Sequence, residues 1–356
     1  MKRIFSKYTA KMLLVAGLVY ASNQNAVAGN EERSGQAGAS ELLINPWART
    51  SGLADANVGG VAGLEATFLN IAGLARLEST MEIGLSSVQW FGDIDINTLG
   101  FAYRVSEDGV LALSISSWSF GDILTTTTED PEGDIGTFSP TYTNMALSYA
   151  KSFTPTISGG ITMRVLSEST PNMDATGITL DIGVQYVSGD NNELKFGITL
   201  KNVGPKLMYS GDGDDIKLTN DATQGVDFQQ NYEHRMDPFE VPSLLSIGGS
   251  YDIIMDDDNI ITPMATFTSN SFTKDNFNLG VEWNFKSRMV LRGGYRLESD
   301  ITAEYDEGRT NALTGFTAGA SYVLPVNNEQ KFVINYSFRS ADPLDSPHSF
   351  GLSMNL

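Results

Sequence analysis

The chain of 356 residues carries 43 acidic and 23 basic residues, a formal net charge of −20, with two histidines and no cysteine. The missing cysteines exclude disulfides and thiol nucleophiles, and two histidines cannot supply a Cys/His zinc cluster. The acidic balance disfavours a nucleic-acid partner, because nucleic-acid binding depends on neutralising phosphates with Lys and Arg. Taken alone, the mean hydropathy of −0.13 is typical of a water-soluble protein.

Residues 1–28 predict a secretory signal peptide. Four basic residues within the first eleven precede an apolar run over residues 12–20, which is too short to span a bilayer as a helix. Ala26-Val27-Ala28 then supplies an A-x-A cleavage pattern, and no acidic residue occurs before Glu31. The alternative, an uncleaved anchor, is disfavoured because polar residues follow the apolar run at once. We therefore expect the protein to leave the cytoplasm.

The rest of the chain divides into three parts by its pattern. Residues 29–41 are polar and rich in Gly and Ser, which predicts a linker. Residues 42–78 are rich in Gly and Ala and show no clean period. Residues 79–356 alternate apolar and polar side chains, as over 277–285, where apolar residues occupy every second position. Such alternation indicates strands with one apolar and one polar face.

About fourteen alternating runs can be counted, each roughly 9–13 residues long, a length that suits a tilted strand crossing a bilayer. They lie near 80–91, 94–105, 110–120, 141–152, 156–167, 176–188, 193–204, 243–254, 259–270, 275–285, 288–298, 312–323, 331–340 and 348–356.

The connections between these runs alternate between tight turns and longer loops. The longer loops are predicted at 121–140, 167–175, 205–242 and 299–311. Short turns at one end and long loops at the other are typical of outer-membrane barrels, in which the short turns face the periplasm. An even strand count places the C-terminus on the periplasmic side, and we expect the chain to enter the barrel there too.

A soluble β-sandwich also has alternating strands. The barrel is favoured by the export signal, by the apolar final strand and by large apolar-face residues near strand ends, which predict aromatic girdles. These are Trp90, Trp118, Tyr149, Tyr186, Tyr251, Phe285 and Tyr322. The expected fold is therefore all-β, a transmembrane antiparallel β-barrel of about fourteen strands in the outer membrane, with lipid around it. The low mean hydropathy is then the average over an apolar lipid-facing stripe, a polar lumen face and acidic loops.

Seven charged residues lie on the predicted lumen face: Arg164, Asp181, Lys195, Lys201, Glu282, Arg292 and Arg296. Their functional interpretation is a charged constriction or a ligand site. The alternative is a salt-bridge network that braces the barrel interior. The mixture of both charge signs favours the network.

The sequence offers little for catalysis or for metal binding. The acidic loop 211–215 could present carboxylates to calcium, but it lacks the twelve-residue EF-hand spacing, so a solvated loop is favoured. No nucleophile elbow, zinc-protease or phosphate-loop motif occurs, and His234 and His348 are far apart in the sequence. We therefore expect no enzyme activity, no cofactor and no metal site.

Three motifs resemble the PorV/PorQ family. Residues 48–56 read ARTSGLADA and are followed by Asn70-Ile71-Ala72-Gly73-Leu74-Ala75, where the family usually reads N-P-A-G-L-A. Residues 201–206 read KNVGPK, close to a strand end typical of PorV-like proteins. Residues 343–353 are similar to the family's last strand.

The resemblance implies a FadL-like barrel of fourteen strands over 79–356, with residues 42–78 folded into the lumen as a hatch. It marks Asn70, Ile71, Ala72 and Gly73 as the hatch motif. Ile71 stands where the family usually has proline, so the fixed φ of proline is lost at this position.

Members of the family work with the type IX secretion system. The PorV type accompanies the translocon and binds the C-terminal signal domain of cargo, and the PorQ type belongs to a surface-attachment complex. The first hypothesis is thus a barrel that binds the translocon or exported cargo through the long loops 121–140 and 205–242. The alternative is a FadL-like transporter of hydrophobic small molecules. A diffusion porin is disfavoured because a plugged lumen would not conduct.

Overall fold

The computed structural model describes residues 30–356 except 129, 134, 221–227, 233–235, 257, 305–308, 310 and 328–329. The expected signal peptide over 1–28 lies outside the described residues. Within the described part of the chain, no helix is both long enough and apolar enough to cross a membrane.

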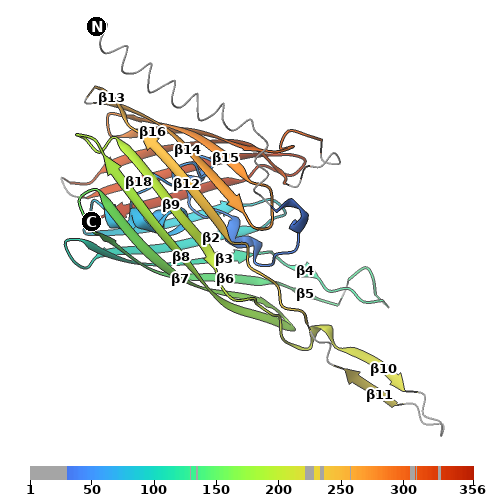
Figure 1. The fold of residues 1–356 in the computed structure, drawn as a ribbon. Helices are drawn as coiled ribbons and strands as arrows, with labels where there is room; N and C mark the ends of the chain where they lie inside the picture. Colours follow the sequence, from blue (N-terminus) through green and yellow to red (C-terminus); the bar gives the residue numbers. More distant parts are fainter. Residues whose placement is uncertain are drawn as a thin grey trace.

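Fourteen antiparallel strands close into a barrel, in which the first strand pairs with the last (Figure 1). This confirms the fold class expected from the alternation. The strands follow one another around the barrel in chain order. They are β1 (Met81–Gln89), β2 (Asp95–Arg104), β3 (Gly109–Ser119), β6 (Thr141–Ser152), β7 (Ile157–Thr170), β8 (Met173–Ser188), β9 (Leu194–Val203), β12 (Leu244–Tyr251) continued by β13 (Ile253–Asp256), β14 (Asn259–Asn270), β15 (Asn276–Phe285), β16 (Met289–Glu298), β17 (Leu313–Pro325), β18 (Lys331–Ala341) and β19 (His348–Asn355).

Two small hairpins project from one end of the barrel (Figure 1). β4 (Ile123–Leu124) pairs with β5 (Thr137–Phe138), and β10 (Ile216–Asn220) pairs with β11 (Phe228–Tyr232). Both hairpins belong to the long loops, and the short turns lie at the opposite end, so we assign the hairpin end to the cell exterior.

One expected loop is instead part of the wall. Residues 167–175 were predicted to form a long connection, but β7 and β8 stay paired as far as Thr170 and Met173. A tight turn at Pro171-Asn172 joins them. This stretch alternates less clearly between apolar and polar residues because it extends beyond the part of the wall that faces lipid.

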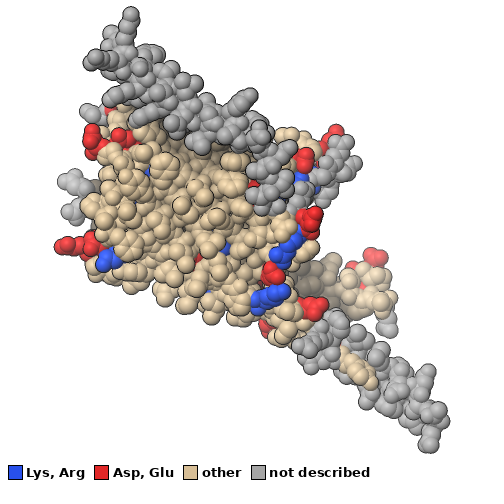
Figure 2. All heavy atoms as spheres, in the orientation of Figure 1, with Lys and Arg blue, Asp and Glu red and all other residues tan. Residues whose placement is uncertain are grey.

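The two faces of each strand differ as the alternation predicts. On β2, Leu99 and Phe101 are 50% and 40% exposed, whereas Ile96 and Ala102 are fully buried. The outer surface in Figure 2 is largely free of charge along the middle of the barrel, and the charged side chains gather toward its two ends. A continuous apolar stripe of this kind is the surface that a barrel presents to lipid.

Two tryptophans expected in the aromatic girdle face the interior instead. Trp118 is only 3% exposed and packs with Val88 and Ile96, and Trp90 packs against the same cluster. On β3 the outward side chains are the alternate ones, such as Leu113. The sequence prediction failed here because Trp118 has the polar-face parity of its strand, although its side chain is apolar.

The N-terminal part of the described chain runs through the barrel. Residues 30–41, expected to be a linker and here named the strap, lie at the extracellular end, where Arg33 forms an ion pair with Glu240. The hatch, residues 42–78, then crosses the lumen to the periplasmic end, where Arg76 contacts Thr156 and β1 begins (Figure 1). We expected the chain to enter the barrel from the periplasmic side. The strap lies instead at the extracellular end, where it is anchored on the loop between β9 and β12.

The strap and the hatch contain only short helical pieces. These are η1 (Glu31–Arg33), η2 (Ser40–Leu43), α2 (Ala48–Ser51), α3 (Ala66–Leu69) and η3 (Ile71–Arg76). The largest apolar core joins hatch side chains, including Val61, Leu64 and Leu74, to the wall residues Ala102 and Ala150. The interior is therefore built from small wall residues and larger hatch residues.

Candidate functional site

The hatch motif is centred on Asn70, which is 1% exposed. Its side-chain Oδ1 accepts a hydrogen bond from the Ala72 N–H, which caps η3. Its Nδ2 donates to the carbonyl oxygens of Val58 in the hatch and Val184 in β8, at 3.0 and 3.2 Å. Asn70 thus shapes the local turn and also ties the hatch to the barrel wall.

Ile71 and Gly73 complete this turn through packing. Ile71 is 2% exposed and belongs to the main apolar core. A side chain at position 73 would overlap the carbonyl oxygen of Val61, so only glycine fits there. The Asn70 cap fixes the start of η3 without the proline ring that the family usually has at position 71.

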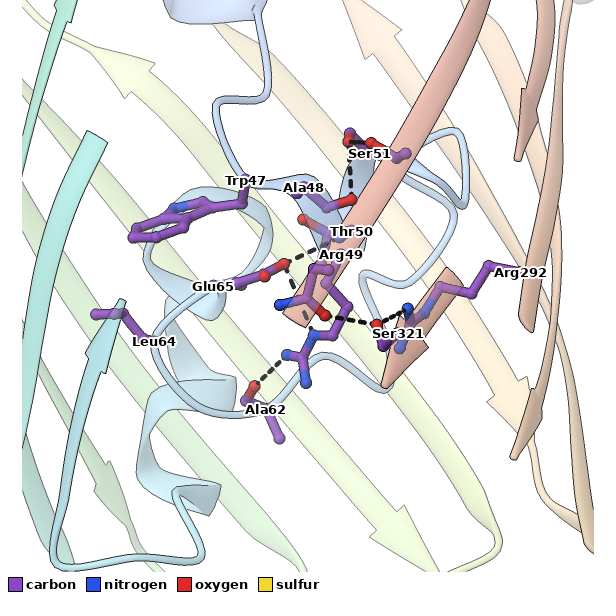
Figure 3. A network of polar contacts seen from close by, with 12 residues as sticks. Trp47, Ala48, Arg49, Thr50, Ser51, Ala62, Leu64, Glu65, Arg292 and Ser321 are labelled. Atoms are coloured by element: carbon purple, nitrogen blue, oxygen red, sulfur yellow. Dashed lines mark hydrogen bonds and ion pairs between the residues drawn. The ribbon is translucent and has the colours of Figure 1, made fainter. Parts of the chain in front are cut away.

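Arg49 lies at the centre of a polar cluster between the hatch and the wall (Figure 3). Its Nη2 donates to the carbonyl oxygen of Ala62 at 2.8 Å, and its Nε lies 3.7 Å from Glu65 Oε2. The same Glu65 oxygen accepts the backbone N–H of Thr50 at 2.9 Å. The arginine therefore links two turns of the hatch that are about fifteen residues apart in the sequence.

Two wall carboxylates add to the field around Arg49. Glu82 of β1 accepts the backbone N–H of Leu64 at 2.8 Å, and Glu282 of β15 also lies within electrostatic reach. The negative charges of Glu65, Glu82 and Glu282 all act on the Arg49 guanidinium. Arg49 is thus a firmly charged residue that neutralises carboxylates from both the hatch and the wall.

The charged residues predicted on the lumen face form local pairs. Arg292 Nε lies 2.6 Å from Glu282 Oε2, and Arg292 also donates to Ser321. Arg164 Nη2 lies 2.9 Å from Asp181 Oδ2 and 3.4 Å from the carbonyl oxygen of Thr67 in the hatch.

The other three predicted residues have partners outside their own group. Lys195 Nζ lies 2.6 Å from Asp252, and Arg296 lies 3.7 Å from Asp55 of the hatch. Lys201 Nζ lies 3.6 Å from the centre of the Phe68 ring. The structure thus distributes the seven residues among separate contacts, several of which reach the hatch. The sequence did not reveal Arg49, Glu65 or Asp55 as partners, because the hatch has no period from which to assign its faces.

The KNVGPK motif coincides with a β-bulge. The register of β8 and β9 shifts between Leu180 and Ile182, so Asp181 faces two successive residues, Lys201 and Asn202. Both of these side chains are buried, at 5% and 1% exposure. Asn202 has a φ of +58°; its N–H donates to Asp181 Oδ1 and its Nδ2 to the carbonyl oxygen of Pro242. Lys201 keeps the inward parity of β9, and the bulge turns the next residue, Asn202, inward as well.

The bulge leads to a prediction about Asn202. Asn202→Val should destabilise the barrel by roughly 3 kcal/mol, because a β-branched residue is strained at positive φ and the bond to Pro242 is lost. Asn202→Gly should cost roughly 1 kcal/mol, since glycine adopts this φ freely. Urea unfolding of the protein refolded into lipid vesicles measures both values. Equal losses for the two variants would show that backbone strain is not involved.

The acidic loop and the histidines show no metal-binding geometry in the described residues. There, no group of three or more His, Cys, Asp or Glu side chains is arranged to hold a metal ion. Part of loop 211–215 forms the short helix η4 (Asp212–Asp214). His348 Nδ1 lies 2.8 Å from the hydroxyl of Tyr336, and His234 lies outside the described residues.

The closed antiparallel sheet, the apolar outer stripe, and the short turns opposite long loops define an outer-membrane β-barrel. The chain belongs to the PorV family, because the family model described as type IX secretion system protein PorV matches residues 27–238. The expected family and the expected outer-membrane location are confirmed. No curated protein matches the sequence.

Solved structures share the fold. The CymD monoaromatic hydrocarbon channel is 14% identical, with 88% of this chain and 97% of that chain covered and a TM-score of 0.54. The Pseudomonas putida toluene transporter TodX is 12% identical, with 87% and 97% covered and a TM-score of 0.53. At such identities the similarity concerns the fold alone.

Proposed function

We propose that the protein is a non-enzymatic outer-membrane barrel that binds the type IX secretion translocon or its exported cargo through extracellular hairpins. Membership in the PorV family supports this proposal. The observation that carries it is the pair of hairpins, β4–β5 and β10–β11, that project beyond the membrane-facing wall (Figure 1).

The β4–β5 hairpin exposes apolar side chains outside the lipid-facing stripe. Ile123, Leu124 and Ile135 are 41%, 59% and 54% exposed. The last outward residues of β3 before this hairpin are Ser117 and Ser119, so the apolar stripe ends below it. Apolar side chains exposed to water at such a position are typical of protein-binding surfaces. Residues 120–140 also contain five acidic and no basic residues, which favours a partner with a basic surface.

The β10–β11 hairpin offers a second mode of binding. It forms a two-stranded sheet with register from Ile216 opposite Tyr232 to Asn220 opposite Phe228. Each strand of a two-stranded sheet has one edge with free backbone groups, and such edges accept an added strand from a partner. Strand addition tolerates varied side chains, which suits a receptor for many cargo proteins.

Affinity purification from native outer membranes tests the proposal. Wild-type protein should retain secretion components or exported proteins, and Leu124→Ser with Ile135→Ser should lower their yield at least tenfold. A matched control is Leu344→Ser, which removes an exposed apolar residue from another extracellular loop. If the wild type retains no secretion component and no exported protein, the proposal is wrong.

A second candidate function is transport of hydrophobic small molecules. The fold shared with the CymD channel and the TodX transporter supports it. Deletion of the gene should then lower the uptake of a labelled hydrocarbon such as toluene by intact cells. Unchanged uptake would exclude this function and leave the partner-binding function untouched.

A further inference from the structure

The strap is held across the extracellular mouth by the loop between β9 and β12. Arg33 Nη2 lies 2.9 Å from Glu240 Oε2, and Lys206 Nζ lies 3.1 Å from the other oxygen of the same carboxylate. The Gly38 N–H donates to the Glu240 carbonyl oxygen at 3.1 Å, and Ala37 forms a β-bridge with Glu240. Backbone and side chain of one loop residue thus fasten the strap.

A small apolar cluster lies beneath these contacts. It joins the strap, the first hatch residue, β7 and the same extracellular loop. Its members are Ala39, Leu42, Leu166, Leu207 and Val241, with Phe239 packed against them. The strap therefore covers a buried interface, and its detachment would expose that interface to water.

Two acidic residues meet at the edge of this cluster. Glu41 of η2 and Glu168 of β7 are 6% and 3% exposed, and their carboxyl groups interact directly. The other titratable groups that face the pair are Tyr142 of β6 and Tyr209 of the β9–β12 loop, whose hydroxyl donates to Glu168 Oε2. In the described part of the chain, no ion pair includes Glu41 or Glu168.

The hydrogen-bond pattern leaves an acceptor at this pair open to a proton. Glu168 Oε1 is buried and receives no hydrogen bond from any N–H or O–H placed among the described residues. A protonated Glu41 carboxyl is a donor at the right place. Two carboxylates that are buried together without a cation cannot both ionise without strong repulsion. Burial first, and the charge of Glu168 second, raise the pKa of Glu41 to about 8.

We propose that Glu41 and Glu168 form a proton-controlled latch, in which a shared proton holds the strap over the extracellular mouth and loss of the proton releases it. The latch does not depend on which partner or substrate the barrel serves. It would make access to the hatch from the cell exterior dependent on external pH.

The sign and size of the effect follow from linkage. A released strap returns Glu41 to water and to its ordinary pKa of 4.5, whereas the closed strap holds it at about 8. The closed state is therefore most stable below pH 4.5 and loses stability as the pH rises toward 8. The equilibrium constant for opening should rise roughly tenfold per pH unit across this window and level off above it.

The absence of cysteine makes this equilibrium measurable by thiol labelling of the full chain in lipid nanodiscs. Ala39→Cys places a thiol in the buried cluster, where Ala39 is 5% exposed. The rate at which this thiol reacts with a membrane-impermeant maleimide is the measured quantity. Dividing it by the rate for Thr128→Cys, a variant at an exposed loop position, removes the pH dependence of thiol reactivity itself. The normalised rate should rise roughly a hundredfold between pH 5.5 and 7.5.

Two variants in the Ala39→Cys background separate the latch from the other contacts of the strap. Glu41→Gln should give a rate that does not change with pH. Glu240→Gln should raise the rate at every pH and keep the slope, because it weakens the strap without touching the pair. A flat wild-type profile, or an unchanged slope in Glu41→Gln, would overturn the proposal. Suppression of labelling at pH 8 by millimolar Ca²⁺ would also overturn it, since the pair would then hold a cation.

Discussion

Replacing Arg49 with alanine should lower the free energy of unfolding by about 3 kcal/mol and loosen the hatch. The substitution leaves Glu65 and Glu82, each 8% exposed, without the cation that neutralises them. Removing one partner of a buried ionic group costs about 3–5 kcal/mol. We expect the lower end of that range because a third of the Arg49 side chain is exposed inside the barrel. Chemical unfolding in lipid vesicles measures the loss, and planar-bilayer recordings measure any added conductance.

Two further variants identify the cause of this effect. Arg49→Lys keeps the charge but replaces the guanidinium that spans Ala62 and Glu65, so it should recover only part of the stability. Arg76→Ala removes another hatch arginine, one that donates to the carbonyl oxygen of Thr156. A loss as large for Arg76→Ala as for Arg49→Ala would mean that hatch packing, and not the neutralised carboxylates, explains the result.

The barrel itself was predictable from the sequence because strand periodicity depends on one property, the alternation of faces. Leu99 and Phe101 alternate with inward residues on β2 over its whole length, and most strands follow the same rule. The count of fourteen strands followed from it, whereas the barrel was inferred from the export signal and the apolar final strand, and the long-loop end from the lengths of the connections. The prediction failed where an apolar side chain faces inward, as Trp118 does, because hydrophobicity alone does not distinguish lipid from a packed lumen.

The hatch contacts were not predictable in the same way. Arg164, Asp181, Glu282 and Arg292 were placed on the lumen face by parity, but parity does not say which of them meet. Their partners depend on how neighbouring strands are staggered and on the path of an aperiodic segment. In the sequence Arg49 belongs only to a family motif, and its role depends on Glu65 and Glu82, which the fold brings close to it. Likewise, the bulge at Asn202 comes from a local register shift that the alternation hides.

Leu279→Arg should destabilise the barrel by about 2–4 kcal/mol, the cost of placing an arginine on the lipid face near the middle of the membrane. Leu279 is 36% exposed and lies in the central part of β15, between Ala265 of β14 and Tyr295 of β16. It belongs to the lipid-facing stripe, so water cannot solvate the introduced charge. Chemical unfolding of the refolded protein in lipid vesicles gives the difference in free energy from wild type.

Leu297→Arg is the matched control, because the same substitution is made on the same outer face. Leu297 is 44% exposed but lies next to the extracellular end of β16, one residue before its last residue, Glu298. The cost of arginine falls to about 0–1 kcal/mol near the membrane interface. A change at Asn278, which points into the lumen, should likewise be much milder than Leu279→Arg. Equal losses at positions 279 and 297 would mean that β15 and β16 do not cross the bilayer at this depth. Equal losses at 278 and 279 would mean that the assignment of inner and outer faces is reversed or absent.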